Sequence, residues 1–263
     1  MLAADGPPAD AALLEVRGLR RRFGGVVALD GLDLDVAAGT ITALIGPNGA
    51  GKTTAFQCIS GVLPADGGSV AFAGRDVTRL RPDRITRAGL VRSFQIARGI
   101  PRLSVLENLM LYAPGQPGEG VAAALLGRGR EAEESAREAA VAVAGRLGLL
   151  RLGNAPAASL SGGQKKLLEL GRALMARPRM ILLDEPVAGV NPTLAEEIAA
   201  HLRALRDEGM TFLVVEHHMD LVARLCDPVV VMAEGRVLAQ GKFAELAADP
   251  AVQEAYMGRR QWR

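Results

Sequence analysis

The spacing of hydrophobic residues in the first part of the chain predicts strands. Residues 14–16 and the alternation of Leu and Val within residues 32–36 have the period of two that half-buried strands show. Residues 41–45 instead form a short apolar run that stops at Gly46. Such a run is typical of a central strand that leads into a glycine turn.

Three later apolar runs favour a sheet that is covered on both faces. Residues 180–183, 211–215 and 229–232 are rich in aliphatic and β-branched side chains, and each run is too short for an ordinary helix. Between the first two, residues 193–208 repeat Leu or Ile on one helical stripe and end before Gly209. The order strand, helix, strand indicates a parallel sheet.

The middle of the chain has a different pattern. Residues 131–150 are rich in Ala and Glu and have helical character, residues 113–120 are punctuated by Pro and Gly, and no strong strand pattern lies between residues 81 and 178. We therefore expect a helical subdomain, at roughly residues 85–175, inserted into an α/β core.

Composition narrows the functional classes. The 263 residues carry 31 Lys and Arg against 29 Asp and Glu, a balance that disfavours nucleic acid as a partner. The two cysteines, Cys58 and Cys226, lie far apart, which argues against a disulfide or structural zinc. No stretch approaches the ~20 apolar residues of a membrane span. The first ten residues contain no leader pattern, so we expect a soluble, cytosolic chain that meets a membrane through a partner.

Residues 46–53 read Gly-Pro-Asn-Gly-Ala-Gly-Lys-Thr and fit the phosphate-binding loop pattern GxxxxGK[ST], directly after a predicted strand. Glycines let backbone N–H groups curl around phosphate oxygens, and the following helix adds its positive N-terminal end. Lys52 would bridge the β and γ phosphates, and Thr53 would bind Mg²⁺. The nucleotide-contacting residues predicted here are Gly46, Pro47, Asn48, Gly49, Ala50, Gly51, Lys52, Thr53 and Thr54.

Two carboxylates end the apolar run at residues 180–183. Asp184 would hold Mg²⁺, directly or through water, and Glu185 would polarise the water that attacks the γ-phosphate. The alternative is a turn at a strand end with two solvated acids. Because the carboxyl edge of a parallel sheet also carries the phosphate loop, the catalytic interpretation places both acids beside Lys52.

Residues 160–164 read Leu-Ser-Gly-Gly-Gln and precede a helical stretch at residues 165–175. Ser161 can cap this helix while the glycines expose backbone donors, which makes a site for an anion. Alone, such a segment is an ordinary loop and helix start. After a phosphate loop and before an acidic strand, it resembles the signature sequence of ABC ATPases.

The resemblance to ATP-binding subunits of ABC transporters runs from about residue 14 to residue 258. It implies a P-loop NTPase core with a mostly parallel sheet, an N-terminal antiparallel β subdomain and the inserted helical subdomain. The nucleotide-binding domain would span residues 12–258 after a flexible tail, residues 1–11. Two such subunits hold two ATP molecules between them. The resemblance implies that the signature residues contact the γ-phosphate of the ATP that the partner subunit binds. These residues are Ser161, Gly162, Gly163 and Gln164.

The same resemblance implies further site residues. Phe23 would stack on adenine, and Gln95 would reach Mg²⁺ and link the core to the helical subdomain. His217 would be the switch histidine that contacts the γ-phosphate and orients Glu185. The family usually has Asp at the next position, where this chain has His218, so which imidazole faces the phosphate stays open.

Several segments look like the importers of branched-chain amino acids. They are residues 22–25, 92–95 and 188–192, a long insertion after residues 107–109, and the tail at residues 255–258. The generic signature at residues 160–164 departs from many members of that subfamily. An importer of urea or short amides, or an exporter of lipid or lipopolysaccharide, is the alternative. A soluble ABC ATPase outside transport is disfavoured, because the chain has neither a second cassette nor a long coiled coil.

The resemblance also implies partners and a location. They are a second ATPase subunit, identical or different, integral membrane permease subunits and, indirectly, a solute-binding protein. The chain would be a peripheral subunit on the cytoplasmic face of the plasma (inner) membrane, with ATP and Mg²⁺ as its cofactors.

Overall fold

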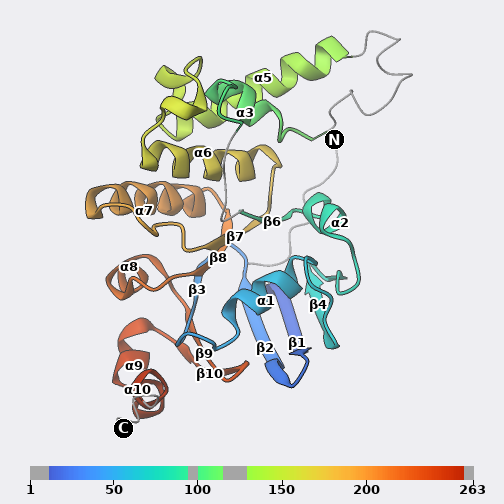
Figure 1. The fold of residues 1–263 in the computed structure, drawn as a ribbon, viewed down its shortest axis with the longest axis vertical. Helices are drawn as coiled ribbons and strands as arrows, with labels where there is room; N and C mark the ends of the chain where they lie inside the picture. The colour runs from blue at the N-terminus through green and yellow to red at the C-terminus, as the bar shows by residue number, and fades with distance from the viewer. Residues whose placement is uncertain (1–11, 94–99, 115–128, 258–263) are drawn as a thin grey trace. The chain divides into compact units, whose positions relative to one another are not determined.

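The computed structural model describes residues 12–93, 100–114 and 129–257. The chain divides into two compact units (Figure 1). The first unit comprises Met1–Arg92, Arg179–Pro186 and Leu202–Arg263, and the second comprises Ser93–Pro178 and Val187–His201. None of the helices in the described ranges is both long and apolar enough to cross a membrane.

The first unit contains an antiparallel sheet of four strands in the order β2-β1-β4-β5. These strands are β1 (Ala12–Phe23), β2 (Val26–Ala37), β4 (Gly67–Phe72) and β5 (Arg75–Asp76). A tight turn joins β1 to β2, where Gly24 has a φ of 57° that suits glycine. Buried and exposed residues alternate along much of β2, as expected of a sheet with one face in the core.

The second sheet of this unit has six strands in the order β10-β9-β3-β8-β7-β6. Neighbours are parallel except for β9 and β10, which are antiparallel. Every residue of β3, β7 and β8 is buried, which explains why these strands have continuous apolar sequences. The strands are β3 (Ile41–Ile45), β6 (Leu90–Arg92), β7 (Met180–Asp184), β8 (Thr211–Val215), β9 (Val229–Ala233) and β10 (Arg236–Gly241).

Helix α1 connects the cores of the two sheets. Its Phe56 and Ile59 are fully buried in one cluster with Leu14 of β1 and Leu213 of β8. The remaining helices of the first unit follow the strands, and α10 contacts both α9 and β10 (Figure 1). The helices are α1 (Lys52–Ile59), α2 (Pro82–Arg87), α8 (Met219–Leu225), α9 (Phe243–Ala248) and α10 (Pro250–Met257).

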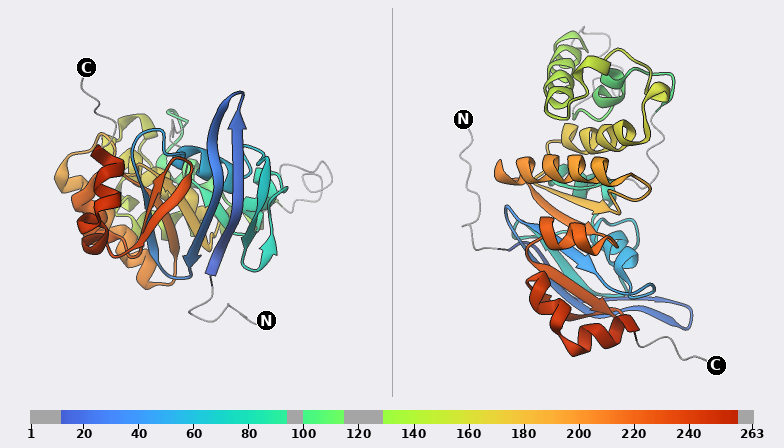
Figure 2. Two further views of the ribbon diagram at one scale, coloured as in Figure 1. Left: turned by 90° about the horizontal axis from the view of Figure 1, so that it is seen from below. Right: turned by 90° about the vertical axis from the view of Figure 1, so that its left-hand side faces the viewer.

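The second unit is helical. Helices α3 (Val105–Met110), α5 (Gly129–Arg146) and α6 (Gly162–Met175) pack pairwise against one another (Figure 2). The unit also includes residues 192–201 of α7 (Pro192–Asp207). At Gly171 an added Cβ would lie 2.8 Å from Cδ2 of Leu109, so glycine allows α6 to approach α3 closely.

The predicted fold class is confirmed, and the strand predictions differ in detail. The strands expected at residues 41–45 and 211–215 have those bounds in the structure, whereas the strand expected at residues 14–16 extends over the whole of β1. The expectation of no strand between residues 81 and 178 was wrong. Leu90–Arg92 forms β6, which pairs with β7 and belongs to the first unit. Three residues are too few to show a periodic pattern.

Candidate nucleotide-binding site

The loop between β3 and α1 requires glycine at two positions. Gly46 has a φ of 148°, and a Cβ there would lie 2.1 Å from the carbonyl oxygen of Met232. Gly51 has a φ of 101°, and a Cβ there would lie 2.4 Å from the carbonyl oxygen of Ala28. Because rigid backbone atoms occupy both spaces, a larger residue would displace the loop. Backbone atoms of β9 and β2 therefore lie close to the loop at these two positions.

Lys52 begins α1 and is 6 % exposed. Its Nζ donates hydrogen bonds to the carbonyl oxygens of Gly46, at 2.6 Å, and Pro47, at 3.0 Å. Burial lowers the pKa of Lys52, and the negative charges of Glu185 and Asp184 oppose that effect. The ammonium group thus lies inside the loop, within electrostatic reach of both carboxylates.

Asp184 ends β7 and is almost fully buried. Its Oδ2 lies 3.2 Å from Nη2 of Arg92, the last residue of β6. Because β6 and β7 are parallel neighbours, their carboxyl ends meet at the same edge of the sheet. Arg92 is a site neighbour that the sequence analysis did not single out. The signal that could have predicted it is a charged residue at the end of a strand.

Glu185 follows Asp184 in a left-handed conformation with a φ of 49°, which is uncommon for a residue other than glycine. Its backbone N–H donates to the carbonyl oxygen of Val215, at 2.9 Å. Its Oε1 lies 3.3 Å from Nε2 of His217. This backbone conformation costs energy of order 1 kcal/mol.

The two adjacent histidines have different partners. The His217 imidazole faces Glu185, whereas Nδ1 of His218 lies 3.1 Å from Oε2 of Glu216. The same oxygen of Glu216 accepts hydrogen bonds from the backbone N–H groups of His217, at 3.0 Å, and His218, at 3.4 Å. The buried Glu216 carboxylate therefore fixes the backbone that carries both imidazoles. No sequence motif pointed to Glu216.

The signature residues lie at the N-terminus of α6 in the second unit. Ser161 caps the helix: its Oγ accepts from the N–H of Gln164, at 3.3 Å, and its N–H donates to Oε1 of Gln164, at 2.9 Å. A Cβ added to Gly163 would lie 2.1 Å from Leu194, whereas one added to Gly162 would meet no atom within 4 Å. The helix begins at residue 162, three residues before the predicted start.

Two further predicted site residues are Phe23 and Gln95. Phe23 ends β1 and is 45 % exposed, with the guanidinium of Arg21 4.9 Å from its ring centroid. Gln95, predicted to reach Mg²⁺, lies outside the described residues.

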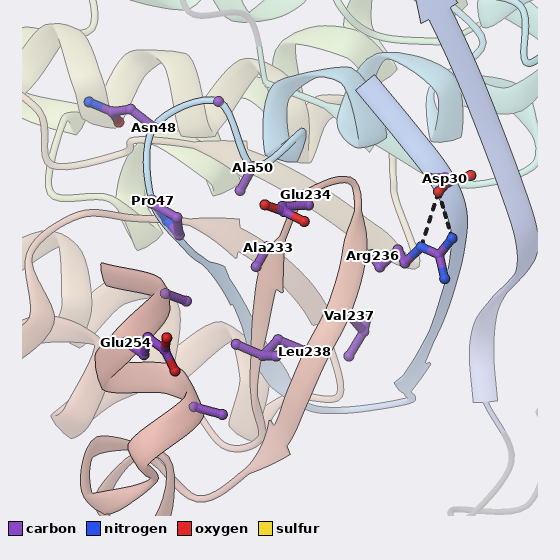
Figure 3. Close-up of a pocket in the computed structure, with 13 residues that line it drawn as sticks. Asp30, Pro47, Asn48, Ala50, Ala233, Glu234, Arg236, Val237, Leu238 and Glu254 are labelled. Atoms are coloured by element: carbon purple, nitrogen blue, oxygen red, sulfur yellow. Dashed lines mark hydrogen bonds and ion pairs between the residues drawn. The ribbon is translucent and has the colours of Figure 1, made fainter. Parts of the chain in front are cut away.

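A pocket of about 670 Å³ runs along the loop in the first unit (Figure 3). Pro47 and Asn48 line one side of it, and Glu254 of α10 lines another. Arg236 of β10 also contributes to its wall, where it pairs with Asp30 at 2.6 Å. The C-terminal helix is thus a neighbour of the loop.

Comparisons with known proteins point to one family. A family model described as ABC transporter matches residues 29–188, and a model described as branched-chain amino acid ATP-binding cassette transporter matches residues 236–260. A probable branched-chain amino acid transport ATP-binding protein of Archaeoglobus fulgidus is 41 % identical over 246 residues, which cover 94 % of this chain and 95 % of that protein. A high-affinity protein of the same description from Pseudomonas aeruginosa is 37 % identical, with 94 % and 98 % covered.

Solved structures agree as well. The ADP conformation of an ATP-binding cassette of an ABC transporter superposes with a TM-score of 0.83 at 38 % identity, covering 95 % of this chain and all of that one. A nucleotide-free cassette gives a TM-score of 0.82 at 38 % identity, with 93 % and 98 % covered. The family match spans more than half of the chain, and the relatives match almost its full length. The chain belongs to the ABC transporter family, as an ATP-binding cassette.

Proposed function

We propose that this ATPase drives an importer of branched-chain or other hydrophobic amino acids. The observation that carries the catalytic part is the convergence of Lys52, Asp184, Glu185 and His217 at one sheet edge. The relatives named for branched-chain amino acid transport support the substrate class, since they match almost the whole chain.

The four side chains divide the chemistry between them. Glu185 would align and polarise the attacking water, and His217 would hold Glu185 in place and contact the γ-phosphate. Lys52 would leave the loop carbonyls for the β and γ phosphates and neutralise developing charge there. Phosphoryl transfer needs positioning and charge compensation more than covalent chemistry. These four side chains supply both.

Asp184, Thr53 and Gln95 would hold Mg²⁺. Carboxylate, hydroxyl and amide oxygens are hard donors of the kind this cation prefers, and one or two protein ligands beside the phosphates are enough. Asp184 already has Arg92 on its Oδ2, which leaves its second oxygen for the cation or its water. Bound Mg²⁺ would supply charge neutralisation between the β and γ phosphates.

The N-terminus of α6 would complete the site of a second subunit. Ser161 and the open backbone at Gly162 present donors at the positive end of the helix, a place that favours a phosphate group. Two ATP molecules would then hold two subunits together, and hydrolysis would release them. The partner ATPase, the permease subunits and an associated solute-binding protein complete the proposed assembly on the cytoplasmic face of the membrane.

Transport in liposomes tests this proposal. The chain, assembled with its cognate permease subunits and binding protein, should take up labelled leucine, isoleucine or valine only with Mg-ATP, and the Glu185→Gln complex should not. ATP-dependent uptake of urea instead of amino acids, or movement of lipid outward, would reassign the substrate while leaving the ATPase intact. No ATP turnover by the wild-type complex would refute the motor itself.

A further inference from the structure

The segment between β8 and α8 is organised by one buried carboxylate. Glu216 directly follows β8 and is 1 % exposed. Its Oε2 accepts hydrogen bonds from the backbone N–H groups of His217 and His218, and it lies 3.1 Å from Nδ1 of His218. Because a carboxylate only accepts hydrogen bonds, the proton of this imidazole contact lies on Nδ1. A charge buried at this depth is unfavourable without such contacts, so the carboxylate and the short segment around it stabilise each other.

Residue 218 is fixed on both sides of its backbone. Its N–H donates to Glu216, and its carbonyl oxygen accepts from the N–H groups of Leu221 and Val222, each at 3.0 Å, in the first turn of α8. The side chain of His218 precedes this helix without capping it and turns back to Glu216 instead. The Nδ1 atom of His218 is therefore already engaged by the protein itself.

His217 lies between these two anchored residues, and its imidazole has a different partner. Its Nε2 lies 3.3 Å from Oε1 of Glu185, whose backbone N–H donates to the carbonyl oxygen of Val215 at 2.9 Å. Because β8 is buried at every residue, Val215 is a rigid point of attachment. The chain from residue 215 to residue 217 thus contacts Glu185 twice, and Glu216, between those two contacts, fixes the backbone of His217.

We propose that Glu216 is a positioning residue for ATP hydrolysis. Its carboxylate fixes the peptide of His217 and retains the imidazole of His218, so that His217 is the imidazole that orients Glu185. This inference rests on the proposed roles of Glu185 and His217 in hydrolysis. Glu216 is buried and acts through His217. Since a displacement of about 1 Å at a catalytic site can cost about 10²-fold in rate, the anchor of the His217 backbone matters for turnover.

The test is Glu216→Gln, which keeps the size of the side chain and removes its charge. A neutral amide oxygen accepts backbone hydrogen bonds more weakly than a carboxylate, so the His217 peptide should loosen. In the full-length chain, kcat for ATP should fall about tenfold. The Kd for ADP, which has no γ-phosphate for His217 to contact, should stay within about twofold of the wild type. Unchanged kcat, or a loss of ADP affinity as large as the loss of kcat, would overturn the inference.

A double-mutant cycle separates positioning from a general effect on folding. If Glu216 acts through His217, Glu216→Gln should lower kcat by no more than about twofold once His217→Asn has already removed the imidazole. A second tenfold loss, measured from His217→Asn, would mean that Glu216 supports the fold at large, and the inference would be lost. Glu245→Gln is the matched control. Glu245 also accepts from a backbone N–H, that of Lys242, in the same unit, and this variant should keep the wild-type kcat.

The two histidines test the selection of His217 without any change at Glu216. His217→Asn should lower kcat at least about tenfold more than His218→Asn, because the imidazole of His217 is the one beside Glu185. In His218→Asn the amide N–H takes nearly the place of Nδ1–H and can still donate to Glu216. Equal losses in the two variants, or a larger loss in His218→Asn, would contradict the proposed role of Glu216.

Glu185→Gln, measured in parallel, keeps the inference distinct from the function on which it rests. Loss of turnover in Glu185→Gln with no effect of Glu216→Gln would refute the role of Glu216 alone. Wild-type turnover in Glu185→Gln would refute the catalytic assignment itself.

Discussion

The edge of the parallel sheet and the N-terminus of α6 use polar groups in opposite ways. At the sheet edge, the first unit satisfies its own charges: Lys52 bonds loop carbonyls, Asp184 pairs with Arg92, and Glu185 meets His217. At α6, Ser161 closes a capping box, but Gly162 beside it faces open space. The difference is consistent with the proposal that the first region carries the reaction, whereas the second presents donors to a phosphate held by another subunit.

The strongest way to break this comparison is Glu185→Gln. The amide keeps the size of the side chain but cannot take a proton from water, so kcat should fall about 10²- to 10⁴-fold. ATP binding should persist, and dimers should accumulate in gel filtration with Mg-ATP because the shared phosphate is not cleaved. Wild-type turnover in this variant would remove Glu185 from the reaction.

Lys52→Ala tests the sheet edge as a binding region. Loss of a charge-assisted contact of about 1.5–3 kcal/mol should weaken ATP binding roughly 10- to 100-fold, as measured by equilibrium titration. Lys166→Ala, which removes a lysine from α6 of the second unit, is the matched control and should bind ATP like the wild type. Equal affinities in the two variants would contradict the division of labour between the regions.

Ser161→Ala and Ser104→Ala sharpen the role of the second region. Both serines close capping boxes, on α6 and α3, so each substitution should cost about 1 kcal/mol of stability in denaturant unfolding. Only Ser161→Ala should also lower the ATPase rate of the dimer, about tenfold or more, since only that serine would face a phosphate. Equal rates in the two variants would reduce Ser161 to a helix cap.

The smallest expected signal comes from the cysteines, which both lie in the first unit. Burial raises the pKa of the Cys58 thiol to about 11 and that of Cys226 to about 12, so at pH 8 both are neutral and poorly nucleophilic. A thiol reagent such as DTNB should not label native protein and should label two thiols in denaturant. Because the second unit has no cysteine, any slow native labelling reports opening of the first unit alone. Rapid labelling at pH 8 would contradict the burial of these side chains.

Local sequence patterns could predict the strands that are buried at every residue. The strands at residues 41–45 and 211–215 could be predicted without knowing which strands they pair with. A strand that is buried at every residue has a continuous apolar sequence. β6 was missed because its three residues are defined by pairing with β7, a partner that is ninety residues away in the chain.

The candidate site divides in the same way. Sequence motifs predicted Lys52, Asp184 and Glu185, whose chemistry depends on residue type and order, and the family resemblance predicted His217. Neither could identify Arg92 or Glu216, because their roles arise from contacts that the fold creates: with Asp184 and with the histidine backbone. The different partners of His217 and His218 also needed coordinates, since adjacent residues of one type differ only in direction.

The left-handed backbone at Glu185 limits how this motor can be arrested. A residue placed there must tolerate a φ near 49°, which excludes the β-branched side chains valine, isoleucine and threonine. Glutamine keeps the original strain, while asparagine and glycine relieve it. Few substitutions at this position can therefore trap the nucleotide-bound complex for structure determination. Those that relieve the backbone strain also remove a constraint on the conformation to be trapped.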